Sequence, residues 1–559
     1  TFLFYVSLFF LFSFALAPTM LGTKASKKYF ILSTAGACLM SLGYPPLATA
    51  PIILIGFVPF LILEDIISRK NTGLHRAEVF KYTFSGFLLW NILTTFWVSN
   101  SALMAGFVAI SLNTLFMSLT FLAFHVTKVK LGKPAGYLSL VVYWLSFEYL
   151  HHHWELSWPW LTFGNSLAGY PSLVQWYEFT GVLGGTLWIW LINILIYFII
   201  RYIYYKKYKE RAFHVYVLIF VFILITPIVY SLIRYRNIPL ENDNKVKVLV
   251  LQPNLDPYEE EFNISPQDNI AIIKKLINNV NAKDVDFIVA QESNIQEGIW
   301  EDEFDSSYSV NEIVKILKDK YPNALYITGA STYKAFKDGE KITSTARYNK
   351  HYDFYYDAYN TALFIDTSGV VGSYHKIKLV AGVEQMPYQN IIKPIEKLAI
   401  NLGGISGSLG KDTIPFVYKH NNAKVGVGIC YESVFGEFIS EFINLGANIL
   451  FVITNDGWWK NTAGHRQHYS YAALRAIETR RDIARAANTG ISCIINRRGE
   501  ILYHTNYWEE TAFVATLSLW DNKTIYTIYG DYIGRISVFA LILLILIDII
   551  KFIIKKIHK

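Results

Sequence analysis

Residues 424–433 read KVGVGICYES, a short apolar run that ends on Cys430 and continues into polar residues. Short runs of β-branched residues bounded by turn signals favour buried strands, so we expect a strand over 424–430 with the cysteine at its end. A cysteine among valines and glycines is often only a small buried hydrophobic side chain. Its meaning therefore depends on what the rest of the chain brings beside it.

Two further apolar runs also finish on an ionisable residue. DFIVAQ, residues 286–291, leads into Glu292, and VVGSYH, residues 370–375, leads into Lys376. Taken singly, such a glutamate is typical of a helix cap, and such a lysine is typical of solvated surface charge. Because ligands and catalytic groups gather at strand ends in α/β sheets, the two residues and Cys430 together indicate one site.

The chemistry available to these three residues is acyl transfer through a thioester. A cysteine attacks as the thiolate, so it needs a nearby base, and Glu292 can accept the thiol proton. Attack on an ester carbonyl places negative charge on oxygen, which Lys376 and the backbone N–H of Tyr431 would stabilise.

The composition indicates a membrane protein. Of the 559 residues, 53% are hydrophobic and only 17% are charged, which is too few charges for an ordinary soluble protein of this size. Several apolar segments approach or exceed the roughly 17 to 25 residues that cross a bilayer core. The expected spans are 1–22, 29–45, 50–66, 80–98, 103–125, 135–151, 183–203, 213–233 and 536–554.

The distribution of Lys and Arg predicts the orientation of these spans. Basic residues cluster in alternate short loops, whereas the loops 44–50, 99–102 and 152–182 contain none. Cytoplasmic loops carry the positive excess, so the long polar region between the last two spans lies outside the cytoplasm. The excess of basic residues is thus a topology signal and indicates no nucleic-acid partner. The predicted parts are an extra N-terminal membrane helix with a basic loop (1–28), a transmembrane helical domain (29–234), an extracytoplasmic catalytic domain (235–532) and a C-terminal helix with a basic tail (533–559).

The outer domain alternates strand-like and helix-like runs, which favours a layered α/β sandwich. The expected strands are 245–252, 286–291, 324–330, 360–366, 424–430, 447–454, 491–496 and 511–517. The expected helices are 265–281, 309–320, 432–444 and 466–487. Two irregular stretches, 331–358 and 385–415, are interpreted as functional loops or lids.

The cysteines leave one competing interpretation open. The chain has three, with no C-x-x-C pair, which argues against a zinc site. Cys430 and Cys493 both fall in the outer domain, where disulfides form, so a structural bridge between them is the alternative to a nucleophile. His151, His152 and His153 lack a convergent set of acidic or cysteine ligands, so no metal is expected there either.

The order Glu, Lys, Cys, set in AQESN, YHKIKLVAGVE and GICYES, resembles the carbon-nitrogen hydrolase (nitrilase) superfamily. With membrane helices on both flanks, the chain resembles specifically the apolipoprotein N-acyltransferases, over roughly residues 29–554. The resemblance implies a multi-span helical membrane domain joined to a nitrilase-like α-β-β-α sandwich. It also implies a catalytic triad of Glu292 as general base, Lys376 as oxyanion stabiliser and Cys430 as nucleophile.

The resemblance extends to residues around the triad. The family's additional essential acids match Glu384 and Glu432, with Tyr431 beside the second, and Pro387 matches the proline that follows the first. The family's lid segment matches Asn455 to Trp458, and we interpret Trp458 and Trp459 as lid residues. Departures occur at 381–383, where Ala-Gly-Val replaces Pro-Phe-Gly, and near 262, where Phe262 or Tyr258 takes the place of a tryptophan.

The function implied by the resemblance is transfer of a fatty acyl group from a phospholipid, through a thioester, to the N-terminal amine of a diacylglyceryl-modified lipoprotein. The implied location is the bacterial inner membrane, with several spans and the catalytic domain on the periplasmic side. No metal or organic cofactor is called for. The alternative is a membrane-tethered amidase that uses the same triad with water as acceptor.

Overall fold

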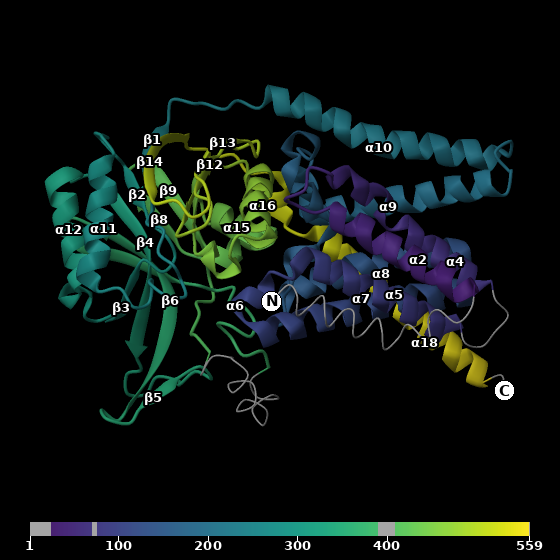
Figure 1. The fold of residues 1–559 in the computed structure, drawn as a ribbon, viewed down its shortest axis with the longest axis horizontal. Helices are drawn as coiled ribbons and strands as arrows, with labels where there is room; N and C mark the ends of the chain where they lie inside the picture. Colours follow the sequence, from purple (N-terminus) through teal and green to yellow (C-terminus); the bar gives the residue numbers. More distant parts are fainter. Residues whose placement is uncertain (1–23, 70–74, 389–407, 558–559) are drawn as a thin grey trace. The chain divides into compact units, whose positions relative to one another are not determined.

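The computed structural model describes residues 24–69, 75–388 and 408–557. Within it the chain forms two compact units, one helical and one built on β-sheets (Figure 1). The helical unit takes in residues up to 99, 106–236 and 529 onward, and the other unit takes in 100–105 and 237–528. The expected span at 1–22 lies outside the described residues, as does much of the 385–415 stretch.

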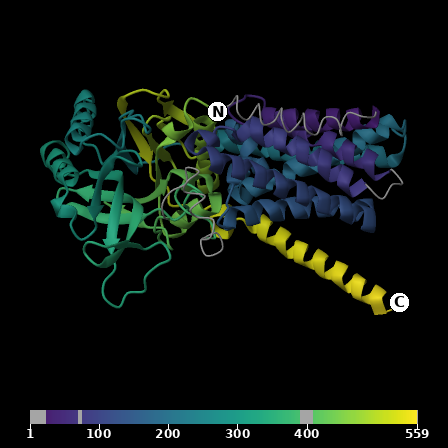
Figure 2. The same ribbon diagram turned by 60° about the horizontal axis from the view of Figure 1, so that its bottom comes forward.

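The helical unit contains long helices at the expected spans (Figure 2). Its helices are α2 (Lys24–Leu42), α3 (Ile53–Gly56), α4 (Val58–Ser68), α5 (His75–Thr95), α6 (Val98–Ser101), α7 (Leu103–Leu131), α8 (Lys133–His153), α9 (Tyr177–Tyr204), α10 (Arg211–Asn237) and α18 (Tyr532–Ile557). Among the described residues, five stretches are long and apolar enough to cross a membrane, namely Ala50–Ser68, Leu103–Leu131, Tyr177–Tyr204, Arg211–Asn237 and Tyr532–Lys551.

Aromatic packing and one asparagine hold the centre of the helical unit. The Phe57 ring lies 4.4 to 5.8 Å, between ring centroids, from six other buried rings. Phe57 also stands at the break between α3 and α4, where helical hydrogen bonds are lost. The Asn193 side chain accepts from the Phe57 N–H at 2.9 Å and donates to the Ile53 carbonyl at 3.0 Å. A polar side chain thus satisfies backbone groups that lipid cannot.

The second unit is an α-β-β-α sandwich. One sheet has the order β14-β1-β2-β4-β6-β5, with β3 on β4 and β7 on β6, and the other has the order β13-β12-β11-β10-β9-β8. The first sheet consists of β1 (Lys245–Gln252), β2 (Phe287–Val289), β3 (Ile295–Trp300), β4 (Leu325–Ala335), β5 (Arg347–Asn349), β6 (Phe354–Asp366), β7 (Gly369–His375) and β14 (Thr511–Ser518). The second consists of β8 (Val417–His420), β9 (Ala423–Ile429), β10 (Ile449–Thr454), β11 (Ile483–Ala487), β12 (Cys493–Ile495) and β13 (Ile501–His504).

Two pairs of helices cover the outer faces of the sheets (Figure 1). Helices α11 (Pro266–Asn279) and α12 (Tyr308–Lys320) bury their apolar faces on the first sheet, and both begin with a serine that accepts a backbone N–H. Helices α15 (Gly436–Asn444) and α16 (Ala463–Thr479) lie on the second sheet. The sheets meet face to face, with the rings of Phe287 and Phe451 5.3 Å apart.

The structure corrects the expected helix at 466–487. Helix α16 ends at Thr479, because Arg480 adopts a left-handed backbone conformation with φ of 52°. Residues Ile483–Ala487 instead form β11, paired in parallel with β10. The sequence IARAA gave a misleading signal, since alanine and arginine favour helices and the strand is buried on both sides.

The stretch 331–358 is also not a loop throughout. Strands β4 and β6 pair as far as Ala335 and Tyr356, and they form an arm that β3 and β5 flank. The arm is held by aromatic packing, since the Trp300 ring lies 5.4 Å from both the Tyr333 and the Tyr356 rings. The expected helix at 432–444 is likewise split, into a short 3-10 turn (Cys430–Val434) and α15.

Gly329, in β4, allows the backbone of Glu292 to approach the sheet. Its N–H donates to the Gln291 carbonyl at 3.0 Å. A Cβ at residue 329 would lie 1.4 Å from the Glu292 carbonyl oxygen, an impossible contact with backbone that has no free end to move. Glycine here is a requirement of the close approach of the two chains.

We expect Gly329→Ala to lower the free energy of unfolding by about 3 kcal/mol and to displace Glu292, because the added methyl group must push the chain away. Thermal unfolding measures the loss. Gly372→Ala in β7 is the matched control, since its Cβ would meet the movable Tyr418 ring at 3.2 Å. Equal stability of the two variants would contradict this account of residue 329.

Candidate active site

Glu292, Lys376 and Cys430 follow β2, β7 and β9, so each comes from the end of a different strand. The Lys376 Nζ lies 2.9 Å from Glu292 Oε1 and 2.8 Å from Glu384 Oε1. The lysine is 1% exposed, so this ammonium is bound by two carboxylates away from water. The structure therefore brings together the predicted base, the predicted lysine and the first additional acid.

A neutral side chain joins the same cluster. The Asn360 Nδ2, from β6, lies 2.9 Å from Glu292 Oε1 and 3.1 Å from Glu384 Oε1. The other oxygens are held by backbone, since Glu292 Oε2 accepts from the Asn455 N–H at 3.1 Å and Glu384 Oε2 accepts from the Val380 N–H at 2.8 Å. Every carboxylate oxygen of the pair has a donor, which is what a buried charged group requires.

The lysine keeps its proton in this setting. Burial alone would lower the pKa of Lys376, but the charges of Glu292 and Glu384 outweigh it and raise that pKa well above its ordinary value. A permanent ammonium is suited to stabilising an oxyanion. It is unsuited to accepting a proton, so Glu292 is the better base.

Cys430 is buried and adopts a left-handed backbone conformation, with φ of 49°. A non-glycine residue in this region stores strain, and such outliers cluster at functional sites. Burial raises the pKa of the Cys430 thiol, the charge of Glu292 raises it further, and Lys376 opposes both. The resting side chain is thus a neutral thiol that needs a base before it can attack.

Cys430 and Cys493 are both free thiols. The bridge between them, the competing interpretation of the sequence, is therefore absent, and Cys430 is available for chemistry. Cys493 is fully buried within β12.

Glu432 holds the segments around the site through hydrogen bonds and, unlike Glu384, forms no ion pair with Lys376. Its Oε1 accepts from the Tyr374 hydroxyl at 2.8 Å and from the Ile377 N–H at 2.6 Å, and its Oε2 accepts from the Ile429 N–H at 2.8 Å. It therefore ties the residues on either side of Lys376 to the residue before Cys430. Tyr431 is buried, with its ring 4.9 Å from that of Phe435.

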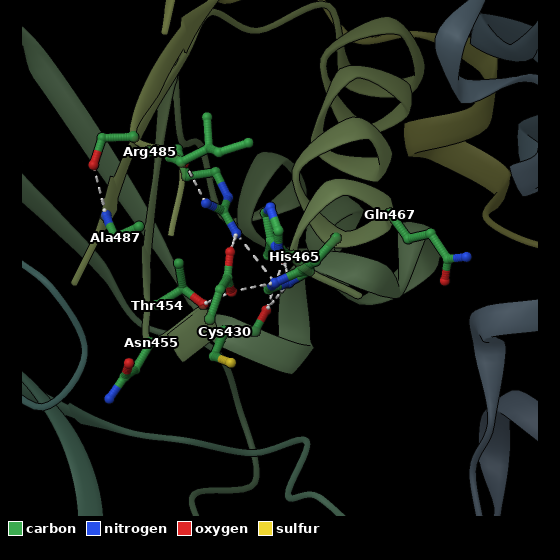
Figure 3. A network of polar contacts seen from close by, with 12 residues as sticks. Cys430, Thr454, Asn455, His465, Gln467, Arg485 and Ala487 are labelled. Atoms are coloured by element: carbon green, nitrogen blue, oxygen red, sulfur yellow. Dashed lines mark hydrogen bonds and ion pairs between the residues drawn. The ribbon is translucent and has the colours of Figure 1, made fainter. Parts of the chain in front are cut away.

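A buried charged network supports the turn that carries Cys430 (Figure 3). His468 Nε2 lies 3.0 Å from the Cys430 carbonyl oxygen, and its Nδ1 lies 2.9 Å from Asp456 Oδ1. Arg485 Nη2 donates to Asp456 Oδ2 at 2.6 Å. Burial opposes the charge on Asp456, but Arg485 and His468 hold its pKa well below the ordinary value. Arg485 could not be singled out from the sequence, because the residues of β11 were expected to be helical.

The predicted lid residues pack against one another. The Trp458 ring lies 5.4 Å from the Tyr258 ring and 5.7 Å from the Phe262 ring. Trp459 lies 5.4 Å from the His468 ring. Phe262 is exposed, whereas Pro387 is buried near the end of a described segment. Whether Trp458 and Trp459 open as a lid stays a prediction.

Glu261 is a buried carboxyl next to the site that the sequence did not reveal. It lies in a run of three glutamates, 259–261, which reads as solvated charge. In the structure its Oε2 accepts from Asn455 Nδ2 at 2.5 Å, and among the described residues its buried Oε1 has no hydrogen-bond partner. Burial raises the pKa of Glu261 to about 8, so it is protonated at neutral pH. Its partner Asn455 is the residue whose backbone donates to Glu292.

Comparison with known proteins agrees with this architecture. Residues 250–523 match the carbon-nitrogen hydrolase family, and residues 36–195 match the apolipoprotein N-acyltransferase N-terminal domain. The chain is therefore a carbon-nitrogen hydrolase domain joined to a helical domain with apolar spans. The apolipoprotein N-acyltransferase of Chlorobaculum tepidum is 25% identical over 92% of this chain and 95% of its own length. That of Geobacter metallireducens is 24% identical over 90% and 92%, respectively.

An amidase from Nesterenkonia sp. is 16% identical to this chain, covers 51% of it and 94% of its own length, and has a TM-score of 0.34. The hydrolase domain alone indicates only the superfamily. The match to the second domain, and relatives that align over nearly the whole chain, identify one family within it. The chain belongs to the apolipoprotein N-acyltransferase family, and it is a multi-pass bacterial membrane protein.

We expect Glu261→Gln to change how stability depends on pH. Between its unfolded pKa near 4.5 and its folded pKa of about 8, wild-type Glu261 binds a proton only in the native state, so stability falls as pH rises through this window. The slope is up to about 1.4 kcal/mol per pH unit. Glutamine keeps an oxygen for Asn455 and cannot titrate, so the fall should be smaller.

Thermal unfolding of both proteins between pH 5 and pH 8 measures the difference. The exposed neighbour provides the control, since Glu259→Gln makes the same substitution at a residue outside the cluster. The account of Glu261 is wrong if both variants keep the wild-type dependence of melting temperature on pH.

Proposed function

We propose that this chain transfers a fatty acyl group from a phospholipid to the N-terminal amine of a diacylglyceryl-modified lipoprotein. The observation that carries the proposal is Lys376, held at 2.9 and 2.8 Å by Glu292 and Glu384, with its charge acting on the buried free thiol of Cys430. The names of the relatives support an apolipoprotein as the acceptor of the acyl group. The helical domain supports the proposal too, since both substrates are lipids that must be met at a bilayer.

The first half-reaction loads the enzyme. Glu292 takes the thiol proton as Cys430 Sγ attacks the ester carbonyl carbon of the phospholipid, and Lys376 stabilises the oxyanion that forms. The carbon–oxygen bond of the ester then breaks, and the leaving alkoxide takes the proton from Glu292. The products are a lysophospholipid and a thioester on Cys430.

The second half-reaction transfers the acyl group from Cys430 to the acceptor. The lipoprotein amine attacks the thioester carbonyl carbon, Glu292 removes a proton from the nitrogen, and the carbon–sulfur bond breaks as the amide forms. The proton held by Glu292 returns to the sulfur, so the enzyme is regenerated. Because the thiol is neutral at rest, Glu292 must carry a proton in both half-reactions.

The proposed location is the bacterial inner membrane, with the catalytic unit on the periplasmic side. The proposal rests on the Lys and Arg residues, which cluster in alternate loops on what should be the cytoplasmic side. Diacylglyceryl-modified lipoprotein and phospholipid would then meet at the outer leaflet. No step above needs a metal or an organic cofactor.

Intact-mass measurement with phospholipid alone tests the thioester. We expect wild-type protein to gain the mass of one acyl chain and to release lysophospholipid, and we expect Cys430→Ala to do neither. Cys493→Ala is the matched control, because it removes another buried free thiol and should still gain the adduct. An adduct on Cys430→Ala would contradict the assignment of the nucleophile.

The acceptor is tested by adding a diacylglyceryl peptide to the acylated enzyme. An N-acylated peptide supports transfer. Release of free fatty acid with no acylated peptide would instead support the alternative, a membrane-tethered amidase-type enzyme that uses water.

Glu292→Gln should lower the rate of adduct formation by about 10²- to 10⁴-fold at pH 7, because the raised pKa of the thiol leaves almost no thiolate without a base. The remaining rate should rise about tenfold per pH unit between pH 7 and pH 9, since it follows the thiolate fraction below the thiol pKa. Single-turnover kinetics across this range measure both effects.

Glu384→Gln is the comparison, because it also removes a carboxylate from Lys376 and leaves Glu292 in place. It should slow the reaction less and should not acquire the steep rise with pH. The same pH profile in both variants would show that Glu292 only positions the lysine.

A further inference from the structure

A large cavity opens among helix ends in the helical unit, away from any residue used above. Its volume is about 630 Å³, within the usual range of roughly 300 to 1,000 Å³ for ligand sites. It lies among the end of α4, the start of α8, the end of α9 and the start of α10. Its lining consists of four basic side chains (Arg69, Lys133, Arg201 and Lys207), five aromatic rings, one proline and one glutamate.

The charge on the cavity wall is unbalanced. Two of its four basic side chains have carboxylate partners, since Arg69 binds Asp65 at 2.5 Å and Lys207 binds Glu210 at 3.0 Å. Within the part of the chain that the structure describes, Lys133 and Arg201 have no carboxylate within 4 Å. Asp65 acts on both only at longer range and is already bound by Arg69, so the four basic side chains outnumber the carboxylates beside them, which favours an anion in the cavity.

The remainder of the wall is aromatic and continuous. The Phe198 ring lies 4.8 Å from that of Tyr137 and 5.1 Å from that of Tyr216, and Tyr216 lies 5.7 Å from Tyr202. The guanidinium groups of Arg69 and Arg201 lie over the Tyr205 ring, 5.3 Å and 5.9 Å from its centroid. Tyrosines of this kind suit a ligand with an apolar body and a polar end.

The position of the cavity favours a lipid. The turn between α9 and α10 lies at the same end of the helical unit as the end of α4 (Figures 1 and 2). The basic loops at this end are those that the positive-inside rule assigns to the cytoplasm. Helix ends meet a bilayer at the level of its headgroup phosphates, and basic pockets between helices on this side bind anionic headgroups.

We propose that this cavity binds the headgroup of an anionic phospholipid of the cytoplasmic leaflet, with Lys133 and Arg201 on its phosphate and the tyrosine wall against its glycerol and first methylene groups. A free inorganic phosphate shares the anionic chemistry but leaves most of the cavity and its aromatic wall empty. The ligand is bound and not consumed, so the site does not depend on the proposed acyl transfer.

Native mass spectrometry of the full chain tests the proposal, with phosphatidylglycerol and phosphatidylcholine as the probes. The measurement is made on Cys430→Ala protein, so no lipid is used up by the acylation proposed above. We expect phosphatidylglycerol to be retained in preference to phosphatidylcholine. Lys133→Gln with Arg201→Gln should weaken retention about thirtyfold, and each single change about fivefold.

Lys209→Gln with Arg211→Gln is the matched control, since these basic residues lie in the same loop region and do not line the cavity. It should leave retention within about twofold of the starting protein, because surface charges contribute little. Equal weakening by the control, or equal retention of phosphatidylcholine, would overturn the proposal. Displacement of the lipid by millimolar inorganic phosphate would also overturn it, because the cavity would then be a free-phosphate site.

The single changes keep the test decisive if the double change prevents folding. Acyl transfer is measured separately on the cavity variants with Cys430 intact. Wild-type protein that retains phosphatidylglycerol but transfers no acyl group would contradict the proposed function alone.

Discussion

The catalytic unit depends on one buried ammonium. Lys376 lies between Glu292 and Glu384, and these three side chains come from segments 84 and 8 residues apart in sequence. Removing Lys376 would leave two largely buried carboxylates without their cation, which costs several kcal/mol. The cluster therefore fixes the loops after β2 and β7 relative to each other before any substrate arrives. Asn360 and two backbone N–H groups donate the remaining hydrogen bonds to both carboxylates.

The same constraint determines which groups can do chemistry. The field of two carboxylates keeps Lys376 protonated, whereas burial and Glu292 keep Cys430 neutral. Both groups thus keep their protons in one site, Lys376 as a cation and Cys430 as a neutral thiol, and their roles follow from these surroundings. The left-handed conformation of Cys430 adds strain that Glu432 and the network around His468 hold in place.

Much of this arrangement could be predicted from the sequence because it follows local patterns. Strand ends at Glu292, Lys376 and Cys430 were recognisable from short apolar runs, and the membrane helices from their hydropathy. Asn360 was missed because a polar residue at the start of the expected strand 360–366 carries no distinct signal; in the structure it lies within β6. Glu261 was missed because burial of one acid among three depends on tertiary packing. β11 was missed because its composition favours a helix, and only pairing with β10 makes it a strand.

The catalytic unit is not one continuous stretch of chain. Residues 100–105 belong to it, although they lie between α6 and α7 in the sequence. Asn100 donates from its side chain to the Trp459 carbonyl at 3.1 Å, and the Tyr258 hydroxyl lies 2.8 Å from the Asn100 carbonyl oxygen. A protein shortened to residues 237–528 would therefore lose the hydrogen bonds that Asn100 makes beside Trp458 and Trp459. The catalytic unit is therefore complete only when the chain also supplies a segment that lies between two helices of the helical unit in sequence.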